Sequence, residues 1–200
     1  MVHRACSLRE ESEMVKLRTR CLLMGDAAVG KSSLCHIFHS EGVQFQRSYN
    51  MTAGVELVTK CVTIPESGHS VELYLVDCPG KDLLAEACEK MWGEAWLLCL
   101  VFDLSSEQSF HSCTRWLQRV QDHCLGSTVS GVLLGNKCDL EERRAVQTQE
   151  AQAWAQAHSL DYYETSAKEL DTSTAPLLRL AQTCLSLYEQ SCERTHSLVS

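Results

Sequence analysis

The feature that most constrains this 200-residue chain is the segment at residues 25–32, Gly-Asp-Ala-Ala-Val-Gly-Lys-Ser. It follows the short apolar run 21–24, which is typical of a buried strand, and precedes Leu34, Ile37 and Phe38 at the spacing of one helix face. A G-x-x-x-x-G-K-[ST] segment between a strand and a helix predicts a phosphate-binding loop, the P-loop. The alternative is an ordinary glycine-containing turn, which is less favoured because both flanking elements are present.

The P-loop is expected to surround phosphate oxygens with backbone N–H groups and a helix N-terminus. Lys31 would place its charge between the β- and γ-phosphates, and Ser32 would offer a hydroxyl to Mg²⁺, which prefers oxygen ligands. The residues expected at the phosphates are Gly25, Asp26, Ala27, Ala28, Val29, Gly30, Lys31, Ser32 and Ser33.

A second motif, Asp77-Cys78-Pro79-Gly80, ends the apolar run 71–76. A carboxylate at the C-terminal end of an interior parallel strand lies at the sheet edge where ligands bind. We expect Asp77 to hold a magnesium-bound water and the Gly80 N–H to meet the γ-phosphate. Many strands end in an Asp-x-x-Gly turn, so this motif gains its weight from the P-loop.

The segment Asn136-Lys137-Cys138-Asp139 follows another apolar run and is suited to bind guanine. Asp139 offers two oxygens to the N1–H and the exocyclic amine of guanine, and adenine lacks that amine, so the carboxylate would be unpaired against it. We expect the Lys137 stem to lie along the base and Asn136 to tie this loop to the P-loop.

A fourth motif, Ser166-Ala167-Lys168, follows about 30 residues later. Its backbone N–H groups are expected to meet the guanine oxygen. The tripeptide has little meaning alone and supports a base site only because of the Asn-Lys-x-Asp segment before it.

Apolar runs alternate with helical patterns along the chain, which predicts an α/β fold of three layers. We expect a P-loop NTPase fold with a mostly parallel six-stranded sheet, one antiparallel edge strand and helices on both faces. The expected strands are 17–24, 54–64, 70–77, 97–103, 131–136 and 161–165, and the expected helices are 31–40, 82–92, 107–124, 148–158 and 174–193. The expected segments are a flexible extension at 1–16, one domain at 17–193 and a flexible tail at 194–200.

The composition excludes several classes of protein. The net charge of −8 argues against a nucleic-acid partner and against a polybasic membrane contact. The sequence has neither a signal peptide nor a long apolar run for a membrane span. The 12 cysteines form no C-x-x-C, and several fall within expected strands or helices, which favours a reduced, cytosolic protein.

The four motifs together resemble the small GTPases of the Ras superfamily, from about Leu17 to about Tyr188. Residues 49–56 are similar to the Rab switch I pattern. The resemblance implies GTP or GDP with Mg²⁺ as cofactors, and Ser32, Thr52 and Asp77 as the metal-binding residues. It also implies an aromatic at the base, Phe45, and a tyrosine over the phosphates, Tyr49. Both could instead be ordinary loop aromatics, because loop lengths vary in this region.

One departure from that family is Lys81, where a glutamine usually orients the attacking water. Glutamine both donates and accepts hydrogen bonds, whereas an ammonium only donates. We therefore expect slow intrinsic GTP hydrolysis, with the catalytic roles on Lys31, Thr52, Gly80 and Lys81.

A second departure concerns lipid anchors, since residues 193–200 have no prenylatable cysteine and Met1-Val2 does not suit myristoylation. We expect no direct lipid anchor. A Rab-like body of this kind resembles the Rab-like GTPases of intraflagellar-transport complex B, as do the 49–56 pattern, the hairpin at 64–73 and the segment 101–113.

That resemblance implies a constitutive heterodimer with the small β-sandwich subunit of complex B, contacts with other complex B subunits, and a link to BBSome machinery. It implies a place in the cytoplasm and the cilium or flagellum, including the ciliary base, and a role in ciliary cargo traffic. Two alternatives stay open: a nucleotide-stabilised scaffold without functional turnover, and a non-prenylated vesicle-traffic Rab.

The last expected helix has more apolar side chains than one buried face needs. One stripe, expected to pack on the sheet, consists of Leu177, Leu180, Ala181, Cys184 and Tyr188. A second set, Leu178, Leu185 and Leu187, lies off that stripe. These leucines are either scattered surface residues or a patch for a permanent partner.

Overall fold

A computed structural model of the chain describes residues 14–40, 51–65, 67–93, 97–124 and 129–199. Its strands are β1 (Lys16–Met24), β2 (Glu56–Thr63), β3 (Ser70–Asp77), β4 (Leu97–Asp103), β5 (Ser130–Asn136) and β6 (Leu160–Glu164). Its α-helices are α1 (Lys31–Ser40), α2 (Asp82–Cys88), α3 (Glu107–His123), α4 (Thr148–Ala157) and α5 (Thr174–Val199). Short 3-10 helices are η1 (Glu89–Met91), η2 (Glu141–Arg143) and η3 (Leu170–Ser173).

Within the described ranges the strands form one six-stranded sheet in the order β2-β3-β1-β4-β5-β6. β2 and β3 pair antiparallel, and the other neighbours pair parallel. The antiparallel pair arises because a short turn joins β2 to β3, closed by a 2.8 Å hydrogen bond from the Ile64 N–H to the His69 carbonyl. The predicted fold class is confirmed.

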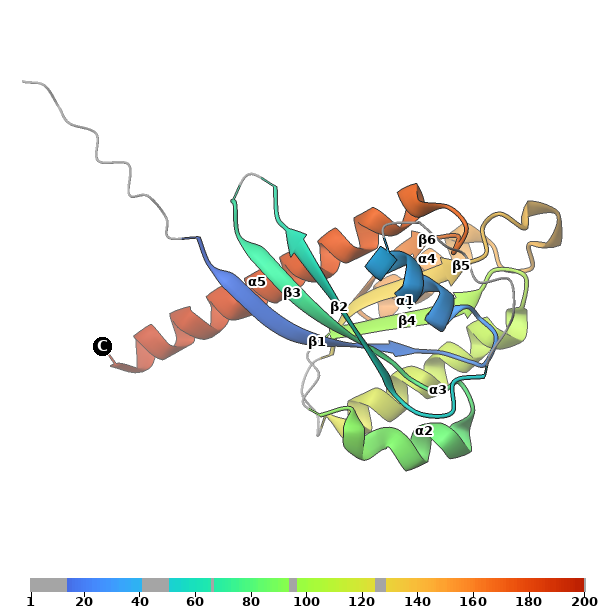
Figure 1. The fold of residues 1–200 in the computed structure, drawn as a ribbon, viewed down its shortest axis with the longest axis horizontal. Coiled ribbons are helices and arrows are strands. Elements are labelled where there is room, and N and C mark those ends of the chain that lie inside the picture. Colours follow the sequence, from blue (N-terminus) through green and yellow to red (C-terminus); the bar gives the residue numbers. More distant parts are fainter. Residues whose placement is uncertain (1–13, 41–50, 66, 94–96, 125–128, 200) are drawn as a thin grey trace, which may run out of the picture.

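Helices cover both faces of the sheet and make three layers (Figure 1). Residues of α1 and α5 share one apolar cluster with the sheet, and residues of α2, α3 and α4 share the other. Every residue of β4 is buried, as is almost all of β5, because both strands lie inside the sheet with helices on either side.

Two helix boundaries differ from those expected. The helix expected over 82–92 ends as α2 at Cys88 and continues as the 3-10 turn η1, and Gly93 then takes a φ of 65° that favours glycine. The last helix was expected to end at 193 but continues to Val199, because residues 194–199 contain no proline or glycine to end it.

The apolar side chains of α5 also differ from the expectation. Leu177, Leu180 and Ala181 are buried as expected, but Tyr188 is 44% exposed. Leu185 and Leu187 pack against the same core cluster instead of forming a second patch. Tyr188 is exposed because α5 projects beyond the body of the molecule, so its C-terminal part has little sheet to cover (Figure 1).

The described cysteines are all free thiols. Cys21, Cys35 and Cys99 are fully or almost fully buried within elements, and burial raises the pKa of each thiol well above its ordinary value. These cysteines act as small apolar core residues. Among the described helices, none combines the length and the apolar character that crossing a membrane requires.

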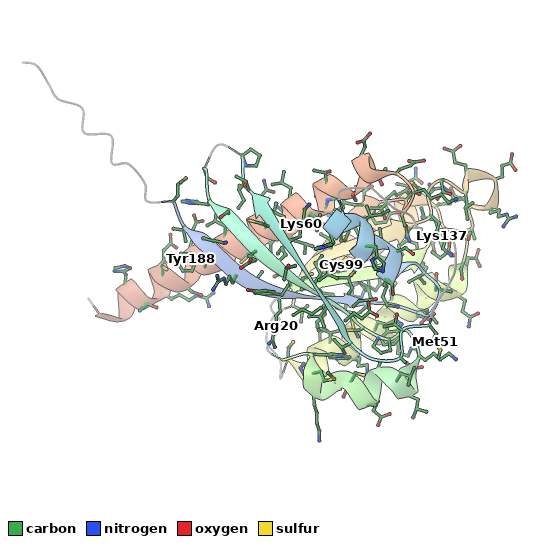
Figure 2. The ribbon with its side chains drawn as sticks, viewed as in Figure 1. Arg20, Met51, Lys60, Cys99, Lys137 and Tyr188 are labelled. Atoms are coloured by element: carbon green, nitrogen blue, oxygen red, sulfur yellow. The ribbon has the colours of Figure 1, made fainter. Side chains whose placement is uncertain are left out.

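The parallel strands bring the four motifs to one edge of the sheet. The P-loop follows β1, Asp77 ends β3, Asn136 ends β5, and Ser166 follows β6. Figure 2 shows Met51 and Lys137 toward this end of the molecule and Tyr188 at the opposite end. The fold therefore places segments that are far apart in the sequence around one site.

Candidate functional site

The loops at this edge enclose a cavity of about 500 Å³. Most of its lining residues belong to the motifs predicted from the sequence: Ala27, Ala28, Gly30, Lys31, Ser32, Ser33, Thr52, Gly80, Lys81, Asn136, Lys137, Asp139, Ser166, Ala167 and Lys168. The structure thus brings the phosphate and base motifs together in a single site.

The P-loop wraps around the side chain of Lys31, which is 6% exposed. The Lys31 ammonium donates to the carbonyls of Gly25 at 2.8 Å and of Asp26 at 2.9 Å. Burial lowers the pKa of Lys31, while the nearby Asp77 carboxylate acts in the opposite direction. Gly25 has a φ of 140°, and a Cβ there would lie 2.0 Å from the Val101 carbonyl oxygen, so only glycine fits. The loop therefore holds a buried cation at the lining of the cavity.

The three predicted metal-binding residues meet although they come from different segments. The Ser32 hydroxyl donates to Asp77 Oδ2 and lies 2.9 Å from the Thr52 hydroxyl. Because the single Ser32 proton is directed at Asp77, Thr52 is the donor in the second contact. Burial raises the pKa of Asp77, and the Ser32 hydrogen bond and the Lys31 charge oppose that shift.

This oxygen cluster fits a magnesium ion. Asp77 is fully buried, and its Oδ1 lacks a hydrogen-bond partner among the described residues. A buried carboxylate oxygen without a partner is costly, so a ligand there would be stabilising. The donors are two hydroxyls and a carboxylate, the hard oxygens that Mg²⁺ prefers. Ser32 and Thr52 could bind the ion directly and Asp77 could bind through a water.

The segment after β3 lies directly on the P-loop. A Cβ at Gly80 would come within 2.4 Å of the Ala27 nitrogen and 2.5 Å of the Asp26 carbonyl carbon, so glycine is required for this approach. Lys81 follows in an extended conformation, is exposed, and lines the cavity. The role expected for Lys81 in hydrolysis stays a prediction.

Asn136 links the loop after β5 to the P-loop and to the loop after β6. Its amide nitrogen donates to the Val29 carbonyl at 2.7 Å, which is the predicted tie to the P-loop. Its Oδ1 accepts the Ala167 N–H at 3.2 Å. Asn136 is 1% exposed, so both bonds are made away from water.

The Asp139 carboxylate lines the same cavity as Lys31. Its Oδ1 accepts the Ser166 hydroxyl at 2.8 Å, and its Oδ2 pairs with the Lys168 ammonium. Burial acts to raise the pKa of Asp139, but the bonds from Lys168 and Ser166 outweigh it, and the pKa lies below its ordinary value. Lys137 has a φ of 67° and pairs with Asp103, a partner that the motifs did not indicate.

The backbone N–H groups of Ser166, Ala167 and Lys168 donate to protein acceptors in this structure. Their acceptors are Thr172 Oγ1 at 3.0 Å, Asn136 Oδ1 at 3.2 Å and Ser166 Oγ at 3.1 Å, respectively. The contact expected between these groups and a guanine oxygen would therefore have to replace or share one of these bonds.

The cavity also has lining residues that the motifs missed, namely His36, Met51, Glu56 and Leu140. His36 follows Ser32 by one helical turn, a spacing that could have indicated it. Glu56 stands opposite Asp77 in the β2–β3 register, and its charge helps to raise the Asp77 pKa. Two predicted residues, Phe45 and Tyr49, lie outside the described residues.

Comparison with known proteins agrees with this geometry. The family model described as the Ras family matches residues 20–186. The chain is 45% identical over 186 residues to an intraflagellar transport protein 27 homolog of Bos taurus, which covers 93% of this chain and 100% of that protein. It is 39% identical over 180 residues to intraflagellar transport protein 27 of Chlamydomonas reinhardtii, covering 86% and 87%. It is also 34% identical over 162 residues to Ras-related protein Rab-30 of Homo sapiens, covering 81% and 77%.

Proposed function

This chain belongs to the Ras family of small GTPases, and from that premise we propose that it binds GTP and GDP with Mg²⁺ and hydrolyses GTP slowly. The observation that carries the proposal is the meeting of Ser32, Thr52 and the unpartnered Asp77 oxygen beside the buried Lys31. A cation and a set of hard oxygen ligands side by side are what a polyphosphate with its metal requires.

Different residues of the cavity would bind the base and the phosphates. Asp139 would accept the N1–H and the exocyclic amine of guanine, a pair of donors that adenine lacks, and Asn136 holds that loop against the P-loop. At the phosphate end, Lys31 and the P-loop N–H groups hold the phosphate charge, and Gly80 brings its own N–H close to the same loop. Mg²⁺, when bound, neutralises charge on the β- and γ-phosphate oxygens.

Hydrolysis also needs a water held in line with the γ-phosphate. The residue that follows the γ-phosphate motif is Lys81, whose ammonium donates hydrogen bonds but accepts none, so it cannot accept a hydrogen bond from the attacking water. The site therefore supports binding better than turnover. This favours slow intrinsic hydrolysis, and it equally suits a scaffold in which the nucleotide is structural.

A displacement assay tests the guanine preference. The purified chain is loaded with labelled GDP in Mg²⁺ and challenged with GTP, GDP or ATP. We expect GTP and GDP to displace the label and ATP to fail. Asp139→Asn should weaken GDP binding by about 1.5–3 kcal/mol, the cost of losing a hydrogen-bonded charge. Asp161→Asn is the matched control, because Asp161 pairs with Arg179 on the surface. Equal displacement by ATP and GTP would contradict the proposal.

We further propose that the chain is a subunit of intraflagellar-transport complex B and works in ciliary cargo traffic. In this proposal it forms a constitutive heterodimer with the small β-sandwich subunit, contacts other complex B subunits and BBSome-linked machinery, and resides in the cytoplasm and cilium. The support is the identity over nearly the whole chain to proteins named for intraflagellar transport, which exceeds the identity to Rab-30.

Purification of the tagged chain from ciliated cells tests this role. We expect a small β-sandwich protein in a one-to-one ratio. Recovery of vesicle-traffic effectors without complex B subunits would favour the vesicle-traffic Rab instead. Measuring partner affinity with GDP and with a GTP analogue then separates a switch, whose affinity differs between them, from a scaffold, whose affinity does not.

A further inference from the structure

Arg115 of α3 connects two acidic residues that lie on different loops of the site. Its Nη2 donates to Asp26 Oδ1 at 3.0 Å, and its Nη1 donates to the Asp82 carboxylate. Asp26 is the second residue of the P-loop, and Asp82 is the first residue of α2, directly after Lys81. One guanidinium therefore spans the phosphate loop and the helix that follows the γ-phosphate motif.

The P-loop end of this link is firmly fixed. Asp26 Oδ1 also accepts the Trp116 indole N–H at 2.8 Å, and Trp116 is fully buried. The Arg115 guanidinium lies 5.1 Å from the centroid of the Trp116 ring, which suits a cation–π contact. The backbone carbonyl of Asp26 accepts the Lys31 ammonium at 2.9 Å. Asp26 therefore contacts both Arg115 and Lys31, the lysine that would hold the phosphates.

The α2 end depends on ionic contacts because the helix has little apolar packing. Of its residues only Ala85 and Cys88 are buried, and Leu83 is 78% exposed. Arg119, one turn after Arg115, pairs with Glu89 of η1 and approaches Asp82 at 3.6 Å. An isolated surface ion pair contributes little to stability. Here, however, Arg115 and Arg119 and their acidic partners form a network beside the buried Trp116, and a network restrains each side chain more than a single pair does.

The arrangement seen here also has Thr52 closed onto Ser32. In GTPases the γ-phosphate and its Mg²⁺ order the switch loops, which are released on hydrolysis. The Arg115 link is present together with this Thr52–Ser32 contact, and that position of Thr52 is the one that a γ-phosphate with its Mg²⁺ would hold. Gly80, two residues before Asp82, packs against the P-loop backbone at Asp26 and Ala27.

Resting on the proposed function, we propose that Arg115 is a positioning residue that couples the P-loop to α2 and favours the GTP-bound state over the GDP-bound state. Loss of this link uncouples α2, and with it Lys81, from the P-loop, although Arg119 still pairs with Asp82 and Glu89. The coupling would therefore change the relative affinity for the two nucleotides and not the affinity for both equally.

The test compares Arg115→Gln with Arg119→Gln in the full chain. Affinities for GDP and for a non-hydrolysable GTP analogue are measured in Mg²⁺, together with the unfolding temperature. We expect Arg115→Gln to lower the ratio of GTP-analogue to GDP affinity by about fivefold. Arg119→Gln should leave the ratio unchanged, because Arg119 pairs with Asp82 and Glu89, whereas the bond to Asp26 of the P-loop comes from Arg115.

A second variant distinguishes loss of the link from a folding defect in Arg115→Gln. Asp82→Asn changes a side chain that is 53% exposed, and it should give the same shift in ratio, with no further shift when combined with Arg115→Gln. An unchanged ratio, an equal fall in both affinities, or the same shift in Arg119→Gln would overturn the inference alone. A native chain that binds neither nucleotide would overturn the proposed function, and this inference with it.

Discussion

The Asn136 side-chain amide donates to the Val29 carbonyl at 2.7 Å, across 107 residues of sequence. This bond joins the loop that would read the base to the loop that would hold the phosphates. It lies next to Gly30, where a Cβ would come within 2.2 Å of the Asn136 nitrogen. Two loops from distant strands are thus fixed against each other by one buried side chain.

We predict that Asn136→Ala destabilises the fold and weakens nucleotide binding together. The variant leaves the Val29 carbonyl and the Ala167 N–H without their partner in a buried place, at a cost of about 1–3 kcal/mol. Urea unfolding and GDP affinity, measured on the same preparation, check this. Gln118→Ala, on the exposed face of α3, is the control. A loss of GDP affinity without any loss of stability would contradict the bracing role.

Much of this site could be predicted because each motif carries its chemistry at a strand end. Lys31, Asp77 and Asp139 are residue types that phosphate, magnesium and guanine demand, and alternating strands and helices bring their strand ends to one edge. The sequence therefore sufficed to predict the sheet, the cavity and most of its lining.

The features that the sequence did not predict depend on contacts between distant segments or on helix ends that no local pattern encodes. Arg115 and Asp103 contact motif residues only because α3 and β4 lie beside those loops in space. Leu185 lies off the helical stripe but still packs on the core, since the twisted sheet does not follow one straight face of a long helix. The end of α5 was misplaced because polar residues without proline or glycine fit a helix as well as a tail.

A pH-dependent loss of stability should follow from Glu164. The Arg144 guanidinium hydrogen bonds to this carboxylate, and with Thr148 and Tyr162 it lowers the Glu164 pKa from 4.5 to about 2 despite partial burial. The unfolded chain therefore binds this proton at higher pH than the folded chain does. The stability contributed by Glu164 is complete above about pH 4.5 and is lost as the pH falls toward 2.

Denaturant titrations between neutral and acidic pH measure this effect. Glu164→Gln should be less stable than the native chain at neutral pH, and the difference should shrink as the pH falls. The control is Glu150→Gln on exposed α4, which should follow the native curve. A difference that stays constant through the acidic range would show that Glu164 contributes through packing and not through its charge.

The contribution of α5 to a stable partner can be tested at Tyr188. Because Leu185 packs on the core, Leu185→Glu should lower stability by about 1–3 kcal/mol and cannot report on partner binding alone. Tyr188 is 44% exposed and lies on the part of α5 that projects from the body of the molecule (Figure 2). Tyr188→Ser should keep the native unfolding temperature and GDP affinity but reduce co-elution with the small β-sandwich subunit. Full co-elution would place the dimer surface elsewhere.

The last prediction concerns turnover at Lys81. A glutamine there can donate to the γ-phosphate and accept from the attacking water, whereas the lysine can only donate. We expect Lys81→Gln to raise the single-turnover rate of GTP hydrolysis by roughly one order of magnitude. Its GDP affinity should change little, because Lys81 is exposed and lies at the phosphate end of the cavity.

The matched control is Lys90→Gln, the same change at an exposed lysine of η1. It should hydrolyse GTP at the native rate. If Lys81→Met accelerates hydrolysis as much as Lys81→Gln does, the lysine acts by charge or bulk and not by its inability to accept a hydrogen bond. If the native chain already hydrolyses GTP as fast as the glutamine variant, the slow turnover inferred from Lys81 is wrong.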